Sequence, residues 1–231
     1  MIVLRDFQLA IDEAPIAEIL PGRLDRPALR RRVDAALADL EALAAPAACY
    51  EVHAIEAMLH DRLQLAGGRR IGSWALSSIV AGADELYLAV CTLGDALDVR
   101  IREHRAEGRA LEMLVLDELG SWAVDQVRMQ LYERAAAELA ERGLRTSSPL
   151  SPGESDWPLR EQRIIFKLVD ATQIGVTLGA GDLMQPVKSL TLAFGAGSRQ
   201  LGSEGLTNCD FCSIQDRCRH AAARRAAAAN R

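Results

Sequence analysis

The first half of the chain alternates between short stretches of period two and helical stripes of apolar residues. Phe7, Leu9 and Ile11 alternate with polar residues, which predicts a short strand, and Pro15 to Leu20 predicts one or two helical turns. Asp25 as a cap, with Pro27 in the first turn, predicts a helix that runs to about Ala45. The apolar positions of this helix follow helical spacing: Leu29, Val33, Ala36, Leu40 and Leu43.

The middle of the chain carries one turn signal and a further strand between two helices. Gly67-Gly68 predicts a hairpin turn, and residues 75–81 predict a short helix. Alternation from Leu86 to Cys91 predicts a strand that ends at Thr92-Leu93-Gly94. Asp95 then begins a predicted helix that runs to about Glu107.

The longest helix is predicted from about Leu111 to Arg142, where Gly143 supplies a stop. Its predicted buried stripe consists of Leu111, Leu114, Val115, Leu119, Trp122 and Val127.

The last third combines a loop, a helix and two strands. The loop covers 146–155, the helix begins at Asp156 and Pro158 and ends near Asp170, and the strands cover 176–178 and 189–194. The mixture lacks a regular strand–helix alternation. It therefore predicts an α+β fold and disfavours a doubly wound sheet.

Composition narrows the class of protein. A net charge of -5 over 231 residues disfavours nucleic acid as a partner. No N-terminal signal and no stretch of about 18 apolar residues is visible, so we expect a cytoplasmic protein away from the membrane. We divide the chain into a main domain, 1–208, and a cysteine motif followed by a basic Ala/Arg tail, 209–231.

The segment from Ser151 to Leu159 reads Ser-Pro-Gly-Glu-Ser-Asp-Trp-Pro-Leu. Pro152-Gly153 signals a turn, because glycine adopts positive φ without strain. Backbone N–H groups ahead of the helix would form a small site for a carboxylate or phosphate. The plainer interpretation is a structural turn, and the loop by itself does not decide between the two.

Extended along the chain, this pattern resembles the activation domain of cobalamin-dependent methionine synthase, especially short stand-alone forms with an SPGYGD-type loop and a terminal cysteine cluster. The likeness covers about residues 85 to 220 and includes Cys91-Thr92-Leu93-Gly94 and the long helix after it. The motif positions after the loop are Gln162, Phe166, Leu168, Asp170, Ile174, Gly175, Val176, Leu178, Met184, Pro186, Lys188 and Ser189.

The resemblance implies a single α+β domain with a twisted antiparallel sheet flanked by helices. It also implies a reactivation component of a split methionine synthase that acts in trans, within a methyltransferase system. Such a domain binds S-adenosylmethionine and presents it to cobalamin carried by a corrinoid partner protein, so that an electron donor and the methyl group restore methylcobalamin from cob(II)alamin. An iron–sulfur electron-transfer protein and a non-catalytic accessory protein for a corrinoid methyltransferase remain the alternatives.

The resemblance implies that the ligand residues lie in and near the loop: Arg145, Ser151, Pro152, Gly153, Glu154, Asp156 and Trp157. The family's loop reads Arg-x-x-x-Gly-Tyr, and its Arg holds the ligand carboxylate. Here Pro149 stands at the Arg position and Glu154 at the Tyr position, while Arg145 lies further upstream. The family's Leu-Thr-Glu-Ser loop is also altered, to Leu178-Gly179-Ala180-Gly181.

Three of the five cysteines, Cys209, Cys212 and Cys218, form a C-x2-C-x5-C motif. Closely spaced thiolates grip a metal ion from one tight turn. His220 would complete a zinc site, whereas Cys91 or Cys49 would be the fourth ligand of an iron–sulfur cluster. A redox-sensitive thiol pair is the alternative to metal binding. Cys49 and Cys91 taken alone are predicted to be buried core thiols.

Overall fold

The computed structural model describes residues 1–10, 16–17, 20 and 25–203. The chain divides into two compact units, one of 1–51, 89–135 and 165–191, the other of 52–88, 136–164 and 192–231. Strands β2 (Ala47–Met58), β5 (Glu85–Thr92) and β9 (Ser189–Gly197) and helix α5 (Ala110–Glu141) each continue from one unit into the other.

The larger sheet has seven strands in the order β4-β3-β2-β5-β9-β6, with β1 (Ile2–Leu4) paired to β2. Its other strands are β3 (Leu63–Leu65), β4 (Arg69–Ile71) and β6 (Arg145–Thr146). Pairs β1–β2, β2–β3, β3–β4 and β6–β9 are all antiparallel. The predicted α+β class and antiparallel sheet are therefore confirmed.

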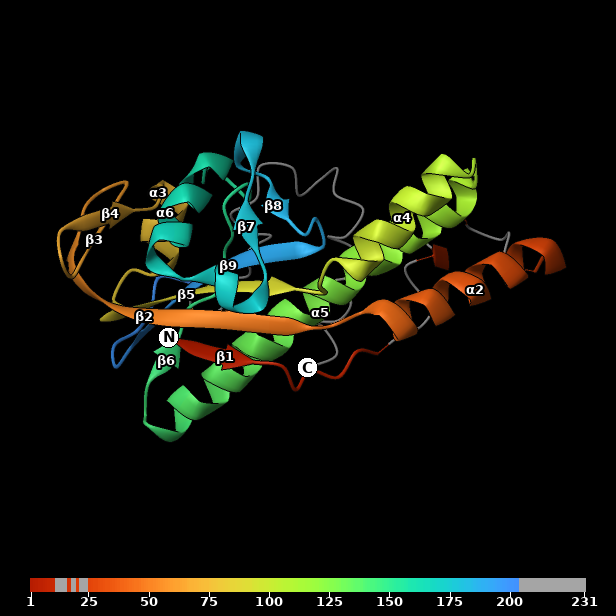
Figure 1. The fold of residues 1–231 in the computed structure, drawn as a ribbon. Coiled ribbons are helices and arrows are strands. Elements are labelled where there is room, and N and C mark those ends of the chain that lie inside the picture. The colour runs from red at the N-terminus through yellow and green to blue at the C-terminus, as the bar shows by residue number, and fades with distance from the viewer. Residues whose placement is uncertain (11–15, 18–19, 21–24, 204–231) are drawn as a thin grey trace. The chain divides into compact units, whose positions relative to one another are not determined.

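The first unit packs helices α2 (Pro27–Leu43), α4 (Ala96–Ala106) and the first part of α5, with α2 and α4 side by side (Figure 1). It also holds the 3-10 segments η2 (Ala171–Ile174) and η3 (Ala180–Asp182) and the small hairpin of β7 (Thr177–Leu178) and β8 (Met184–Gln185). Helix α2 buries Val33, Ala36 and Leu40, three of the five predicted positions. Its cap is Arg26, which makes no side-chain capping bond, so the predicted Asp25 cap was wrong.

The second unit contains the β3–β4 hairpin and helix α3 (Trp74–Ile79). It also contains η1 (Leu159–Glu161), which leads toward helix α6 (Gln162–Leu168). Gly67 and Gly68 have φ of 83° and 76°, which confirms the predicted glycine turn. The predicted single helix from Asp156 to Asp170 is instead a loop followed by two shorter helical pieces.

The predicted strand over Phe7, Leu9 and Ile11 was wrong, although Phe7 is buried as the alternation indicated. Glutamine side chains of α5 take the place of a neighbouring strand. Gln130 accepts from the Gln8 N–H at 3.1 Å and donates to the Gln8 carbonyl, and Gln126 makes the same pair of bonds with Ala10 at 2.7 and 2.9 Å. A side-chain amide carries both a donor and an acceptor, so it can replace a peptide group. Ile11, Pro15, Glu18 and Ile19 lie outside the described residues.

Helix α5 buries Val115, Leu119 and Val127 as predicted, but Leu114 and Trp122 are 47% and 37% exposed. The stripe is displaced because Leu116, Ala123 and Val124 share the buried face. Gly143 ends this helical region with φ of 72°, and the Leu144 N–H returns to the Leu139 carbonyl at 2.9 Å, which confirms the predicted stop. Among the described residues, no helix is long and apolar enough to span a membrane.

Replacing Gln130 by Leu should release the segment before residue 11. The change removes both bonds to Gln8, and each such bond contributes about 1 kcal/mol. We expect amide exchange in a peptide covering residues 1–10 to accelerate about tenfold, measured by hydrogen–deuterium exchange with mass spectrometry. Met129→Leu on the same helix is the control. Unchanged exchange in Gln130→Leu would contradict the assigned role of the glutamine.

Candidate functional site

The predicted ligand loop is closed by its own hydrogen bonds. The Gly153 N–H donates to the Trp157 carbonyl at 2.7 Å, and the Trp157 N–H donates to the Glu154 carbonyl at 3.1 Å. Gly153 has φ of 96°, which a glycine adopts without the steric penalty of a Cβ. The turn signalled by Pro152-Gly153 is therefore present.

The Glu154 carboxylate is bound by a backbone N–H group of the loop in which the sequence predicted an anion site. Its carboxylate accepts from the Ser151 N–H at 2.9 Å, while its own N–H donates to the Ser151 carbonyl at 3.0 Å. An acidic side chain at this position thus acts as an internal anion for the loop. An incoming carboxylate would have to displace it from the Ser151 N–H.

Two further carboxylates of this region hold the start of helix α3. Asp156 accepts from the Ser73 hydroxyl at 2.8 Å and from the Ala75 N–H at 3.0 Å. Buried Glu161 accepts from the Gly72 N–H at 3.0 Å and pairs with Arg62 at 2.9 Å. Asp156 was predicted to cap the helix that follows it, whereas its carboxylate bonds to the beginning of α3.

The remaining predicted ligand residues are divided between core and surface. Ser151 and Pro152 are buried, and Trp157 is 1% exposed, so its indole belongs to the core. Arg145 is exposed on β6, opposite Gly197 of β9. The role of this set in ligand binding stays a prediction.

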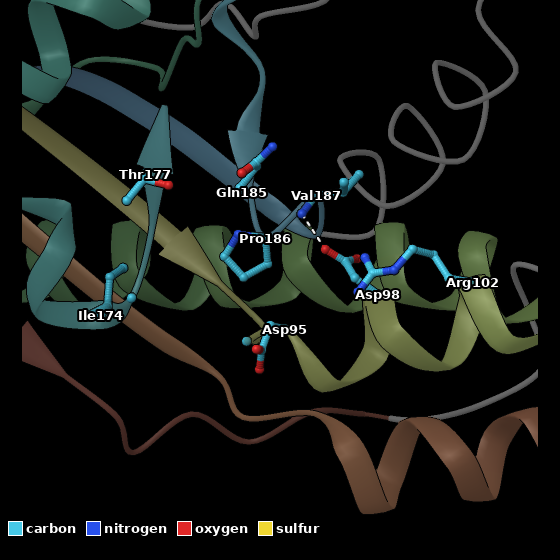
Figure 2. Close-up of a pocket in the computed structure, with 10 residues that line it drawn as sticks. Asp95, Asp98, Arg102, Ile174, Thr177, Gln185, Pro186 and Val187 are labelled. Atoms are coloured by element: carbon cyan, nitrogen blue, oxygen red, sulfur yellow. Dashed lines mark hydrogen bonds between the residues drawn. The ribbon is translucent and has the colours of Figure 1, made fainter. Parts of the chain in front are cut away.

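A pocket of about 590 Å³ lies in the first unit, beside the N-terminal end of α4 (Figure 2). This volume falls within the range of about 300–1,000 Å³ that is common for small-molecule sites. The lining comes from the start of α4, from the turn after η2, and from the end of the β7–β8 hairpin. It consists of Gly94, Asp95, Asp98, Arg102, Ile174, Gly175, Thr177, Gln185, Pro186 and Val187.

One wall of this pocket is fixed by polar contacts on both sides of Val187. Buried Asp98 accepts from the Val187 N–H at 2.5 Å (Figure 2). The next residue, Lys188, accepts at its carbonyl from the Leu93 N–H at 3.0 Å. The Lys188 ammonium, itself on a buried side chain, reaches Asp117 at 2.6 Å and the Ser121 hydroxyl at 3.0 Å. The Pro186–Lys188 segment is thereby held against α4 and α5.

The charged side chains that line the pocket differ in whether they have a hydrogen-bond partner. Asp98 is committed to Val187, whereas exposed Asp95 and Arg102 have no side-chain hydrogen bond or ion pair within the described part of the chain. The sequence reasoning did not single out these residues. Their spacing in the sequence could have identified them. Asp95, Asp98 and Arg102 stand at positions i, i+3 and i+7 of a predicted helix, which places them on one face.

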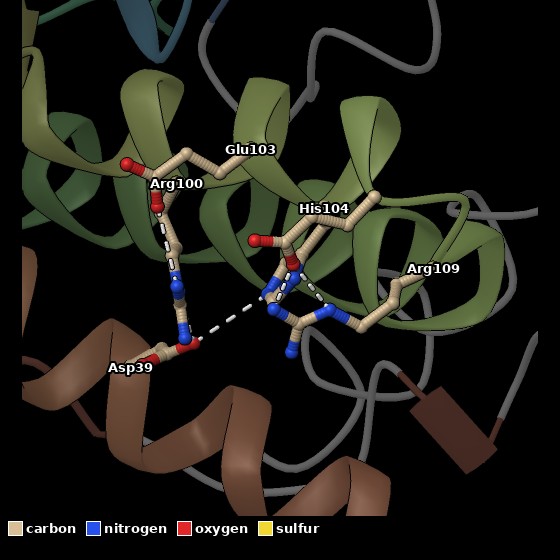
Figure 3. A network of polar contacts seen from close by, with 6 residues as sticks. Asp39, Arg100, Glu103, His104 and Arg109 are labelled. Atoms are coloured by element: carbon tan, nitrogen blue, oxygen red, sulfur yellow. Dashed lines mark hydrogen bonds and ion pairs between the residues drawn. The ribbon is translucent and has the colours of Figure 1, made fainter.

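A second cavity of about 500 Å³ lies between α2 and α4 and shares Asp95 with the first. Beside it, Asp39 pairs with Arg100 at 2.9 Å and lies 3.6 Å from buried His104 (Figure 3). Arg100 also pairs with Glu103 at 3.2 Å. This network ties α4 to α2, so it supports the helix that carries the pocket residues.

The cysteines fall into two groups. Cys209, Cys212, Cys218 and His220 lie outside the described residues, so their metal binding stays a prediction. Within the described residues, no group of three or more His, Cys, Asp or Glu side chains is arranged to hold a metal ion. Cys49 and Cys91 are both fully buried, which confirms them as core thiols, and burial raises the pKa of each to about 12.

Comparison with known proteins supports the fold reached above. No family model matches the chain, and no curated protein matches it. Among solved structures, the chain is similar to the MetH reactivation domain, determined in a crystal structure with bound AdoHcy. The TM-score is 0.60 at 13% sequence identity, covering 87% of this chain and 83% of that one. The chain therefore has the fold of the MetH reactivation domain, which confirms at the level of fold the resemblance drawn from the sequence.

The two buried thiols should make the stability of the fold depend on alkaline pH. Because their folded pKa of about 12 lies above the ordinary value of 9.0, the folded state favours the protonated thiols. Their contribution is complete below pH 9 and is lost as the pH rises toward 12. Between pH 8 and pH 10, the free energy of unfolding should fall by about 1 kcal/mol less in Cys91→Ala than in the wild type, measured by urea denaturation. Identical pH dependence in both proteins would show that Cys91 is not held protonated.

Proposed function

We propose that this chain is a reactivation component of a cobalamin-dependent methionine synthase system and acts in trans on a separate corrinoid protein. The supporting observation is the fold shared with the MetH reactivation domain over 87% of the chain, in a structure that holds AdoHcy. AdoHcy is the product that S-adenosylmethionine leaves after methyl transfer. A site that binds AdoHcy therefore suits S-adenosylmethionine, which differs from it by one methyl group.

The part of this chain in such a reaction is positional. S-adenosylmethionine supplies the methyl group when bound, and cobalamin on the partner accepts it. The chain holds the donor in a fixed orientation against the partner, and this lowers the entropic cost of bringing two large reactants together. A rigid wall such as the one formed by Pro186–Lys188, fixed by Asp98 and Lys188, suits that task better than a mobile loop.

We further propose that Cys209, Cys212 and Cys218 hold a metal centre, either an iron–sulfur cluster or zinc. An iron–sulfur cluster would supply an electron to the partner, whereas zinc would stabilise the C-terminal segment. Anaerobic purification followed by metal analysis separates the two. Stoichiometric iron with sulfide supports the electron-transfer role, stoichiometric zinc supports the structural role, and neither metal would remove the proposal of a metal centre.

One observation favours a second candidate, a non-catalytic accessory protein that binds the corrinoid protein without S-adenosylmethionine. Glu154 already fills the Ser151 N–H of the predicted ligand loop. This candidate predicts a complex with the corrinoid protein whose affinity does not change when S-adenosylmethionine is added. The proposed reactivation component predicts instead a complex that responds to the ligand.

The test is reactivation of a cognate corrinoid protein that has been poised in the cob(II)alamin state. With the chain, S-adenosylmethionine and a chemical reductant, the visible spectrum should change to that of methylcobalamin. Omission of the chain should slow recovery at least about tenfold, the least effect expected when one positioned reactant is lost. Omission of S-adenosylmethionine should prevent recovery. Equal recovery with and without the chain, or no recovery in the complete mixture, would contradict the proposal.

A further inference from the structure

The Glu154 side chain makes a contact that has the form of a helix cap but caps no helix. Its carboxylate accepts from the Ser151 N–H, three residues earlier in the chain, at 2.9 Å. In a capping box, a glutamate bonds in this way to the residue that begins a helix. Here the next helical segment, η1, begins only at Leu159, and the residues between them form turns and loop. Helix capping therefore does not explain the contact.

The backbone around this contact is held by bonds that do not involve the carboxylate. The Glu154 N–H donates to the Ser151 carbonyl at 3.0 Å, and the Glu154 carbonyl accepts from the Trp157 N–H at 3.1 Å. Immediately before Ser151, the N–H and the carbonyl of Leu150 bond to Ala193 of β9 at 2.9 and 2.8 Å. These backbone bonds remain when the Glu154 side chain rotates. The Ser151 N–H therefore keeps its position and direction whether or not the carboxylate is bound to it.

The surroundings of Glu154 allow its side chain to turn toward solvent. Glu154 is half-buried, and its neighbours Gly153 and Asp156 are exposed. Ser151, in contrast, is 6% exposed. A backbone donor on a buried residue is unfavourable without an acceptor, so a vacated Ser151 N–H calls for a replacement. The group that fills the place is a carboxylate, which indicates the chemistry of the replacement.

We propose that Glu154 is a specificity-determining latch. Its carboxylate fills a preformed site for a ligand carboxylate at the Ser151 N–H, and a ligand binds there only by exchanging with it. A tethered group competes as though it were present at about millimolar concentration or above. Small free carboxylates are thereby excluded, whereas a larger ligand that makes further contacts competes successfully. The inference does not rest on the proposed function, because it concerns the response of the loop to any carboxylate.

The test follows the Ser151 amide signal by NMR in the full-length chain, prepared with isotope-labelled serine. The signal is assigned by its absence in Ser151→Ala. Acetate is the probe, and sodium chloride keeps the ionic strength constant. The midpoint of the acetate-induced shift should lie at least about tenfold lower in Glu154→Ala than in the wild type, because the tethered competitor is gone. Glu154→Gln keeps an acceptor but loses the charge, so its midpoint should lie between the two.

Glu138→Ala is the matched control. Glu138 is an exposed glutamate of α5, and its replacement removes the same charge without touching the loop. Its midpoint should stay within about twofold of the wild type, which separates the loss of a local competitor from a general change in surface charge. A shift of the Glu138→Ala midpoint as large as that of Glu154→Ala would overturn the latch.

The remaining outcomes decide the inference without reference to AdoHcy. Equal midpoints in the wild type and Glu154→Ala, or no Ser151 response in either, would overturn it. Should Glu154→Ala lose the dispersed spectrum of a folded chain, Glu154→Gln decides, and a midpoint equal to that of the wild type would overturn the latch. Reactivation that still depends on the chain and on S-adenosylmethionine would then leave the proposed function standing.

Discussion

A buried ammonium group fixes the geometry on which the α4 pocket depends. Lys188 lies immediately before β9 with its side chain buried. Its ammonium pairs with Asp117 of α5 and donates to the Ser121 hydroxyl on the same helix. An unpaired ammonium in this position would lose several kcal/mol of solvation, so the contact strongly constrains where the chain enters the strand. Asp98 applies a second constraint one residue earlier, through the Val187 N–H. Together they determine the position of Pro186 and Val187.

The charged residues around this wall fall into two groups. Asp98 and Lys188 fix the backbone around Val187, while the side chains of Asp95 and Arg102 have no hydrogen bond or ion pair to another described residue. The division resembles that of many small-molecule sites, in which buried polar contacts give rigidity and a few free groups give specificity. The chain shares its fold with the MetH reactivation domain, whose crystal structure contains AdoHcy.

The sequence predicted the fold class, most of the helices and the glycine turns, because these depend on local periodicity and positive φ. It assigned no strand to the region of β2, and it assigned a strand to Phe7–Ile11. The bonds of Gln8 and Ala10 to glutamine side chains of α5 are tertiary contacts that no local pattern records. The loop at Gly153 was located correctly, but its internal occupation by Glu154 depends on a side-chain rotamer. The α4 pocket was missed because Pro186 and Val187 are distant in sequence from Asp95 and become its neighbours only through the fold.

The most direct test of the account is a crystal structure of the full chain with AdoHcy. The account predicts density for AdoHcy bound to the chain. Crystals grown at saturating AdoHcy with no density for the ligand would contradict the proposed dependence on S-adenosylmethionine.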